Sequence, residues 1–405
     1  MVMTQLLRQF KAVLFSGLSA CLIAAPAVAH AQAPAAASAP RHAHTSLGTG
    51  VAVAPSGEIW IVGVNEKRQL FVQRRLGNGR LWQTPQVLDT GDDVVAADGE
   101  NRPKLAFGPN LLAVITYTNP LAKPYTGQIR MLRSIDGGRT FSAPFTVHHD
   151  RQVITHRFES VGFDARGVLH TVWIDKRDLT DAAGKPVPGY RGAAVYRNES
   201  TNGGKSFGPD IKLADHTCEC CRIALAPSPN GRMVAMWRHV FAPSERDHAF
   251  AELSGNAPAE PVRATLDRWA LNACPHHGPG LAPAAGGGYH TVWFGDRAGV
   301  AQVRYGQLDD QGAPRGTPML LPDERAEHAD VASAGNRVAV VWRSYDGEAT
   351  RWRAWLSTDS GRSFTLKELG RSAENNDHPR LVQHGQQIHA LWRTATGVFV
   401  ETLFP

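Results

Sequence analysis

The feature that most constrains the fold is a strand pattern that recurs along the chain. Each copy has a Gly or Asn turn and then an alternating apolar run that ends at or near an aromatic residue. The five strong copies end at Trp173, Trp237, Trp293, Trp342 and Trp392, which lie 49 to 64 residues apart. Two weaker copies cover residues 57–64 and 110–117. A further strand-like run follows each copy, and such alternation of β-branched and aromatic residues is typical of strands.

Seven evenly spaced strand units of this length predict an all-β fold, a β-propeller with four-stranded blades. We expect seven blades, with six as the alternative. No stretch shows a long 3.6-residue period, so we expect little helix. The last copy ends after its third strand, near Leu403. We therefore expect an N-terminal strand near residues 42–50 to complete the last blade and close the ring, which would remove an exposed edge.

Three turns after third strands share the pattern Ser-x-Asp/Asn-x-Gly-x-Ser/Thr-Phe: Ser134–Phe141, Ser200–Phe207 and Ser357–Phe364. Asp or Asn can accept hydrogen bonds from the backbone of its own turn, and Gly accepts positive φ. The pattern resembles the Asp-box of sialidase-like (BNR-repeat) β-propellers, and the resemblance extends over roughly residues 44–405. It implies a propeller fold, six-bladed in the sialidases proper. In that family the boxes are structural, so they imply no chemistry.

The N-terminus has the pattern of a secretion signal over residues 1–31. Arg8 and Lys11 precede an apolar run, and Ala29-His30-Ala31 fits a small-x-small cleavage site. We therefore expect a periplasmic or secreted protein with no membrane span in the mature chain. A lipoprotein box that ends at Cys21 is the alternative, which the continuing apolar run disfavours.

After the signal peptide, an Ala/Pro-rich linker covers residues 32–43 and a single propeller domain covers residues 44–405. Removal of residues 1–31, which contain two basic and no acidic residues, lowers the formal charge from +6 to +4. This charge is mild for the size of the chain and indicates no nucleic-acid partner.

The four cysteines outside the signal lie in two short runs, Cys218-Glu-Cys220-Cys221 and Cys274-Pro-His-His. In the repeat alignment, these runs open the first strands of units four and five. Equivalent positions of adjacent blades lie side by side at one end of the channel. We therefore expect four thiols and the imidazoles of His276 and His277 to converge. Three further histidines hold the same position in units three, six and seven: His156, His328 and His378.

Thiolates with imidazoles select Cu(I) or Zn(II). Structural zinc usually has paired C-x₂-C ligands, and C-x-C-C looks too compressed for three sulfurs on one tetrahedral ion. The sequence therefore predicts a copper site, as Cu(I), with zinc as the alternative, formed by Cys218, Cys220, Cys221, Cys274, His276 and His277. The combination is also similar to exported bacterial propellers associated with copper handling. The predicted role is metal sequestration or delivery, with another envelope metal-handling protein as a partner and no enzymatic turnover implied.

Other interpretations of these residues remain open. Export allows disulfides, and four cysteines permit three pairings. Cys274 beside a histidine could also act as a nucleophile. The alternative function is a glycan-binding or glycoside-hydrolysing sialidase-like propeller with structural disulfides. Four arginines at first-strand openings could bind a substrate carboxylate: Arg102, Arg157, Arg222 and Arg380. The Phe/Tyr-Arg-Ile-Pro motif of sialidases, however, is absent.

Overall fold

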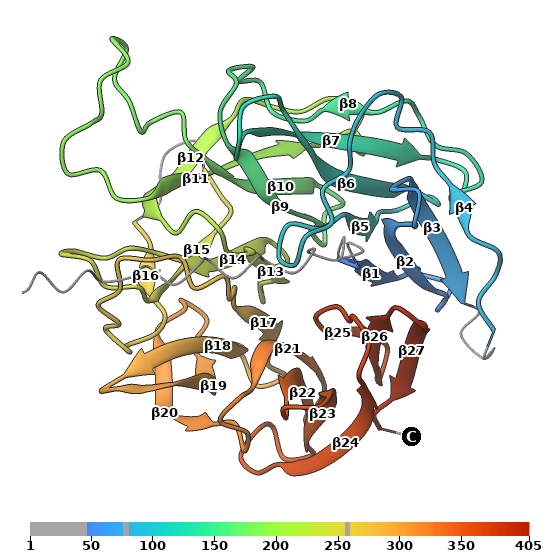
Figure 1. Ribbon diagram of the computed structural model, residues 1–405, viewed down its shortest axis with the longest axis vertical. Helices are drawn as coiled ribbons and strands as arrows, with labels where there is room; N and C mark the ends of the chain where they lie inside the picture. The colour runs from blue at the N-terminus through green and yellow to red at the C-terminus, as the bar shows by residue number, and fades with distance from the viewer. Residues whose placement is uncertain (1–46, 76–80, 256–259, 405) are drawn as a thin grey trace, which may run out of the picture. The chain divides into compact units, whose positions relative to one another are not determined.

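The computed structural model describes residues 47–75, 81–255 and 260–404 (Figure 1). These residues form strands and no helix, as the sequence predicted. None of the described residues forms a helix long and apolar enough to cross a membrane. The predicted signal peptide and linker lie outside the described residues.

The strands pair in chain order into seven antiparallel sheets, which are the seven blades of a β-propeller. The first blade has β1(Gly50–Val53), β2(Ile59–Val64), β3(Leu70–Arg75) and β4(Gln86–Val87), and the second has β5(Lys104–Phe107), β6(Ala113–Pro120), β7(Gly127–Ser134) and β8(Phe145–Thr146). The third blade has β9(His156–Phe163), β10(Leu169–Asp175), β11(Ala193–Ser200) and β12(Ile211–Thr217). The fourth has β13(Ala224–Pro227), β14(Met233–Arg238), β15(His248–Glu252) and β16(Val262–Arg263).

The last three blades complete the ring. They are β17(Gly280–Pro283), β18(Tyr289–Arg297), β19(Val300–Leu308) and β20(Pro314–Leu320); β21(Glu327–Ala334), β22(Arg337–Tyr345), β23(Thr350–Ser357) and β24(Thr365–Ser372); and β25(Arg380–His384), β26(Gln387–Thr394) and β27(Gly397–Thr402). The first strands of neighbouring blades contact one another all the way round, including β1 with β25. We call the segment that leads into each first strand an entry loop.

The recurring aromatic residues lie in the second strand of each blade, in the middle of the sheet. Trp173, Trp342 and Trp392 are fully buried there, and Tyr117 takes this place in the second blade. A buried indole N–H needs an acceptor. Trp173 Nε1 donates to Asp175 Oδ2 at 2.8 Å, and Trp392 Nε1 donates to a backbone oxygen at 2.9 Å. The repeat in the sequence is therefore the buried centre of the blades.

The three predicted turns share one hydrogen-bond arrangement. In the first turn, Ser134 Oγ accepts the N–H of Gly138 at 2.8 Å, and Asp136 Oδ1 accepts the N–H of Thr140 at 3.0 Å. Gly138 has a φ of 76°, and a Cβ atom there would overlap the ring of Trp60 in the preceding blade. Glycine is therefore required both by the turn and by the close approach of two blades.

The closure of the ring differs from the expectation. Among the described residues the last blade has three strands, β25 to β27. Residues 42–46 of the predicted closing strand lie outside the described residues. Leu47–Thr49 form no strand, and Gly50 begins β1, the first strand of the first blade.

A buried ion pair and one further arginine join the first and last blades. Asp377 Oδ2 accepts the N–H of Thr49 at 2.9 Å and Nη1 of Arg102 at 2.8 Å. Arg393 donates to Thr49 Oγ1 at 3.0 Å and to the carbonyl of Val64 at 2.8 Å. Apolar side chains of β2, β3 and β26 pack beside these polar contacts. The entry loop of the first blade is therefore fixed by residues from the end of the chain.

We expect Asp377→Ala to lower the free energy of unfolding by about 3–5 kcal/mol, because Arg102 would keep a buried charge without its partner. The matched control is Glu348→Ala, which breaks an exposed pair with Arg371 and should leave stability nearly unchanged. Guanidinium unfolding followed by tryptophan fluorescence measures both variants. Equal losses in the two variants would contradict this account of ring closure.

Candidate metal centre

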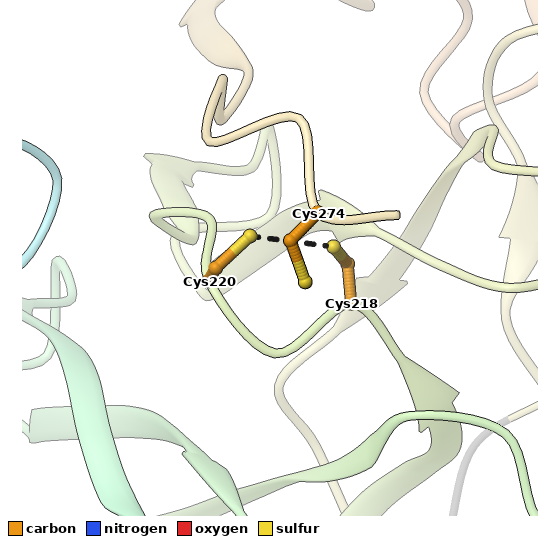
Figure 2. A group of neighbouring side chains, drawn as sticks. All are labelled: Cys218, Cys220 and Cys274. Atoms are coloured by element: carbon orange, nitrogen blue, oxygen red, sulfur yellow. Dashed lines mark hydrogen bonds between the residues drawn. The ribbon is translucent and has the colours of Figure 1, made fainter. Parts of the chain in front are cut away.

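The two cysteine runs lie in entry loops, as the sequence predicted. Cys218–Cys221 lie between β12 and β13, and Cys274 and His277 lie between β16 and β17. These loops lead into the first strands of adjacent blades. Figure 2 shows Cys218 and Cys220 on one loop and Cys274 on the other, with the three side chains close together. The structure therefore brings the two runs together.

Two residues outside the runs explain why the loops meet. A Cβ atom on Gly278 would lie 2.7 Å from the backbone N of Arg222, so only glycine allows this approach. Arg238, which is 1% exposed, ends β14 between the two loops. Its carbonyl accepts the N–H of Cys218 at 2.9 Å, and its guanidinium donates to the carbonyl of His277 at 2.9 Å. One buried arginine therefore holds both entry loops.

Three thiols form a nearly equilateral triangle. The Sγ–Sγ distances are 3.7 Å from Cys218 to Cys220, 3.8 Å from Cys220 to Cys221 and 3.9 Å from Cys221 to Cys218. All three residues are buried. Cys274 is exposed, and its Sγ lies within 4.8 Å of the sulfurs of Cys218 and Cys220. No disulfide joins these four cysteines of the described chain.

This geometry corrects one argument from the sequence. A tetrahedral ion with metal–sulfur bonds of about 2.3 Å holds its sulfurs about 3.8 Å apart. The C-x-C-C run is therefore not too compressed for three sulfurs on one ion, because the turn at Glu219 and Cys220 folds the third thiol back towards the first. Chain spacing alone does not favour copper over zinc.

The thiols influence one another's ionisation. Burial opposes a charge on Cys221, but hydrogen bonds with the Cys218 and Cys220 thiols, together with the charge of Arg238, hold the pKa of Cys221 well below its usual value. Hydrogen bonds with the Cys218 and Cys221 thiols raise the pKa of Cys220. The cluster therefore favours a thiolate at Cys221 that its neighbours solvate. A thiolate is the form that binds metals.

The two predicted histidines are placed differently from each other. His276 lines the same cavity as Cys220 and Cys274. His277 stacks against Phe294 and His328, with ring centroids 4.6 and 4.3 Å apart. Its ligand atoms group with those of Glu327 and His328 rather than with the sulfurs. That His276 and His277 are ligands of the thiol site stays a prediction.

Cys220 and Cys274 open onto a cavity of about 510 Å³, and residues from several entry loops line it. Cys220, Cys274 and His276 form part of its wall, and Glu100, His328 and His378 form another part. Three further polar side chains also line it: Tyr125, Arg157 and Lys176. The volume lies within the range of small-molecule sites, about 300–1,000 Å³.

Glu100 is a site residue that the sequence analysis missed. It lies in the entry loop of the second blade and is buried. Arg222 Nη1 donates to its two oxygens at 3.1 and 3.2 Å, and His328 Nδ1 lies 3.1 Å from Oε1. Burial opposes its charge, but Arg222 and His328 hold the pKa of Glu100 well below its usual value. Nothing in the surrounding sequence marks this glutamate, since its partners come from three other blades.

The four arginines of the glycosidase alternative have internal partners or neighbours of like charge. Arg102 pairs with Asp377, Arg222 with Glu100, and Arg157 lies 3.7 Å from Asp98. Arg380 lines a second cavity, of about 290 Å³, with Arg102, Lys104 and Arg222. Burial and the charges of Arg102 and Arg222 lower the pKa of Arg380 to about 9. The structure thus uses Arg102 and Arg222 to bind its own carboxylates.

Comparisons with known proteins identify the fold. No family model and no curated protein matches the sequence. Among solved structures, a polysaccharide lyase described as an ulvan lyase, bound to -[GlcA(1-4)Rha3S]-, aligns over 89% of this chain and 94% of its own, with 11% identity and a TM-score of 0.54. A protein of unknown function from Dyadobacter fermentans aligns over 78% and 97%, with 14% identity and a TM-score of 0.51.

A Hadza microbial sialidase aligns over 83% of this chain and 73% of its own, with 12% identity and a TM-score of 0.47. The seven blades make the fold a β-propeller, which the ulvan lyase shares over most of both chains. The neighbours agree at this level with the resemblance seen in the sequence. At such low identities they show the fold alone.

The folded protein should become less stable in acid, because His277 is buried in its neutral form. Burial, with the nearby His328 as a smaller cause, lowers the pKa of His277 to about 3. Below pH 6.5 the unfolded chain therefore gains a proton that the folded chain does not. The contribution of His277 to the free energy of unfolding is therefore fully present above pH 6.5. It decreases as the pH falls towards 3, by at most about 1.4 kcal/mol per pH unit.

We therefore expect His277→Gln to make the pH dependence of the unfolding free energy shallower between pH 6.5 and 4. Guanidinium titrations of the metal-free protein at several pH values measure this slope. The matched control is His384→Gln, at the exposed end of β25, which should keep the slope of the parent. An unchanged slope in His277→Gln would show that the ring is protonated in the folded state.

Proposed function

We propose that the protein binds a soft metal ion through Cys218, Cys220, Cys221 and Cys274. The observation that carries this proposal is the triangle of three buried sulfurs with edges of 3.7 to 3.9 Å. Three thiols this close together, without a disulfide, repel one another once ionised unless a cation neutralises them. A cation at the centre of the triangle would turn this repulsion into attraction.

Copper(I) is the first choice and zinc the second. Thiolates are soft ligands, which select Cu(I) and also suit zinc. The three buried sulfurs provide a trigonal set, and the exposed Cys274 offers a fourth sulfur at the cavity. A ligand at the opening is suited to passing an ion in or out. The proposed role is therefore sequestration or delivery of the metal in the cell envelope, with another metal-handling protein as the partner.

Substitution of one sulfur of the triangle should weaken Cu(I) binding strongly. We expect Cys218→Ser, Cys220→Ser and Cys221→Ser each to lower the affinity by more than about tenfold, since even a residue behind a ligand commonly contributes that much. Cys274→Ser, at the exposed position, should have a smaller effect. Competition with a chromophoric Cu(I) chelator under anaerobic, reducing conditions measures the affinities.

Circular dichroism serves as the control that the β fold survives each substitution. The proposal fails if the variant with all four cysteines changed to Ser binds Cu(I) as tightly as the parent. It also fails if thiol titration of the purified protein finds two stable disulfides and metal analysis finds no metal uptake. A preference for zinc over copper in the same competition would reverse the order of the two metals.

The second candidate function is binding or cleavage of a glycan in the cavity. The fold comparisons agree better with this function than with metal binding, because the ulvan lyase that shares the fold is described with a bound saccharide. The specific observation on this chain is the cavity of about 510 Å³ with Tyr125, Arg157 and Lys176 in its wall. Cationic side chains can neutralise an acidic sugar, and a tyrosine can move a proton.

Incubation with a panel of acidic and neutral polysaccharides tests this candidate. A lyase forms a conjugated double bond with ultraviolet absorbance, whereas a hydrolase releases reducing ends without it. We expect Tyr125→Phe to slow either reaction by about 10²-fold or more. Tyr345→Phe, an exposed tyrosine outside the cavity wall, is the matched control and should keep full activity. No product from any polysaccharide would remove glycan cleavage from this candidate.

A further inference from the structure

The second cavity, of about 290 Å³, lies in the central channel, because residues from the first strands of all seven blades line it. None of the described residues lines both this cavity and the one beside the thiols. Arg222 lines the second cavity and its partner Glu100 lines the first, so this ion pair lies between the two. We propose that the second cavity binds a small tetrahedral oxyanion that carries a proton, namely phosphate.

The balance of charge in the cavity wall is the first support. Four of the described residues that line the cavity are basic and one, Asp330, is acidic. Arg102 and Arg222 each pair with a carboxylate of the protein. Lys104 and Arg380, in contrast, form no ion pair with any described residue. Cations inside a protein are usually paired, so two unpaired cations in one wall point to an anionic ligand.

The two unpaired cations have hydrogen-bond donors to spare. Lys104 and Arg380 begin β5 and β25, the first strands that contact β1 on its two sides. Lys104 Nζ donates to the carbonyl of Arg102 at 2.9 Å, and an ammonium group has two further N–H donors. The guanidinium of Arg380 makes no hydrogen bond with a described residue, so its five N–H donors are available. An oxyanion in the cavity would supply acceptors to both side chains.

Arg102 provides a second, independent support. It is only 2% exposed, and its Nη2 makes no hydrogen bond, although Nε and Nη1 donate to protein acceptors. Nearly all buried polar atoms have a partner, so this donor is unusual. A guanidinium group can donate to two oxygens of one oxyanion in parallel. A tetrahedral oxyanion offers enough oxygens for Arg102, Arg380 and Lys104 together.

The size and the surroundings of the cavity suit a small ion. Small-molecule sites usually have volumes of about 300–1,000 Å³, so 290 Å³ has room for an ion and a few water molecules but not for a sugar chain. Apolar side chains such as Val51, Leu105 and Val331 form the rest of the wall. Charges attract one another more strongly beside such a wall than in water. Even with its lowered pKa of about 9, Arg380 is charged at pH 7 and can bind an anion there.

Asp330 determines which oxyanion fits. Its Oδ2 accepts the N–H of Leu381 at 3.0 Å, and it forms no ion pair with the described cations of the wall. An ionised carboxylate only accepts hydrogen bonds, so it favours a ligand that has a proton to donate. Phosphate keeps a proton at pH 7, whereas sulfate has none and would meet only repulsion from Asp330. The site should therefore prefer phosphate to sulfate.

Isothermal titration calorimetry of the metal-free chain with phosphate, at constant ionic strength in chloride buffer, tests the proposal. We expect one phosphate per chain, and sulfate should bind at least about tenfold more weakly. Arg380→Gln and Lys104→Gln should each lower the affinity for phosphate at least about tenfold, because each removes charged hydrogen bonds. Asp330→Asn should narrow the difference between phosphate and sulfate, since an amide can also donate. None of the described cysteines lines this cavity, so the result is independent of the proposed metal site.

Arg139→Gln is the matched control, because Arg139 is exposed and lines neither cavity, and it should keep the affinity of the parent. The proposal is overturned if phosphate does not bind the parent, if sulfate binds as tightly, or if Arg139→Gln weakens binding as much as Arg380→Gln does. If the variants at Lys104 and Arg380 do not fold, crystals of the parent grown with arsenate decide. The anomalous signal of arsenic should lie in the second cavity, and its absence from there overturns the proposal.

Discussion

Arginines that reach from one blade to the next position the entry loops, on which the proposed thiol site depends. Three second strands contain Trp-Arg at or near their end, at residues 237–238, 342–343 and 392–393. Arg238 donates to the carbonyl of His277, Arg343 to that of Asn376, and Arg393 to Val64 and Thr49. In each case the acceptor belongs to the following blade. The repeated tryptophan thus centres a blade, and the arginine after it positions the next one.

The cavity beside the thiols brings two groups of side chains into one space. Sulfurs from the loops of the fourth and fifth blades lie in one part of its wall, and imidazoles with Glu100 lie in another. Arg222 links the two parts, because it directly follows Cys221 in the chain and its side chain binds Glu100. A change in the position of Cys221 would therefore move Arg222 and, through this buried ion pair, Glu100.

Much of this architecture could be predicted from the sequence, because strand alternation and repeat spacing are local or periodic. The seven units, the tryptophan positions and the meeting of the two cysteine runs follow from the repeat. Glu100 could not be predicted, since its partners lie in three other blades. The triangle of sulfurs depends on a turn within four residues, which spacing alone does not describe. The direction of His277 depends on its stacking with Phe294 and His328, which are distant in the sequence.

The closure of the ring has a consequence for folding kinetics. The hydrogen bond from Thr49 to Asp377 joins residues 328 positions apart, so almost the whole chain must be present before it can form. Closing so long a loop is entropically unfavourable, and contacts of this kind slow folding. Until the last blade arrives, the first blade has no neighbour on one side and its apolar face is open to water. The interval between synthesis of the two ends is therefore when this chain is most prone to aggregate.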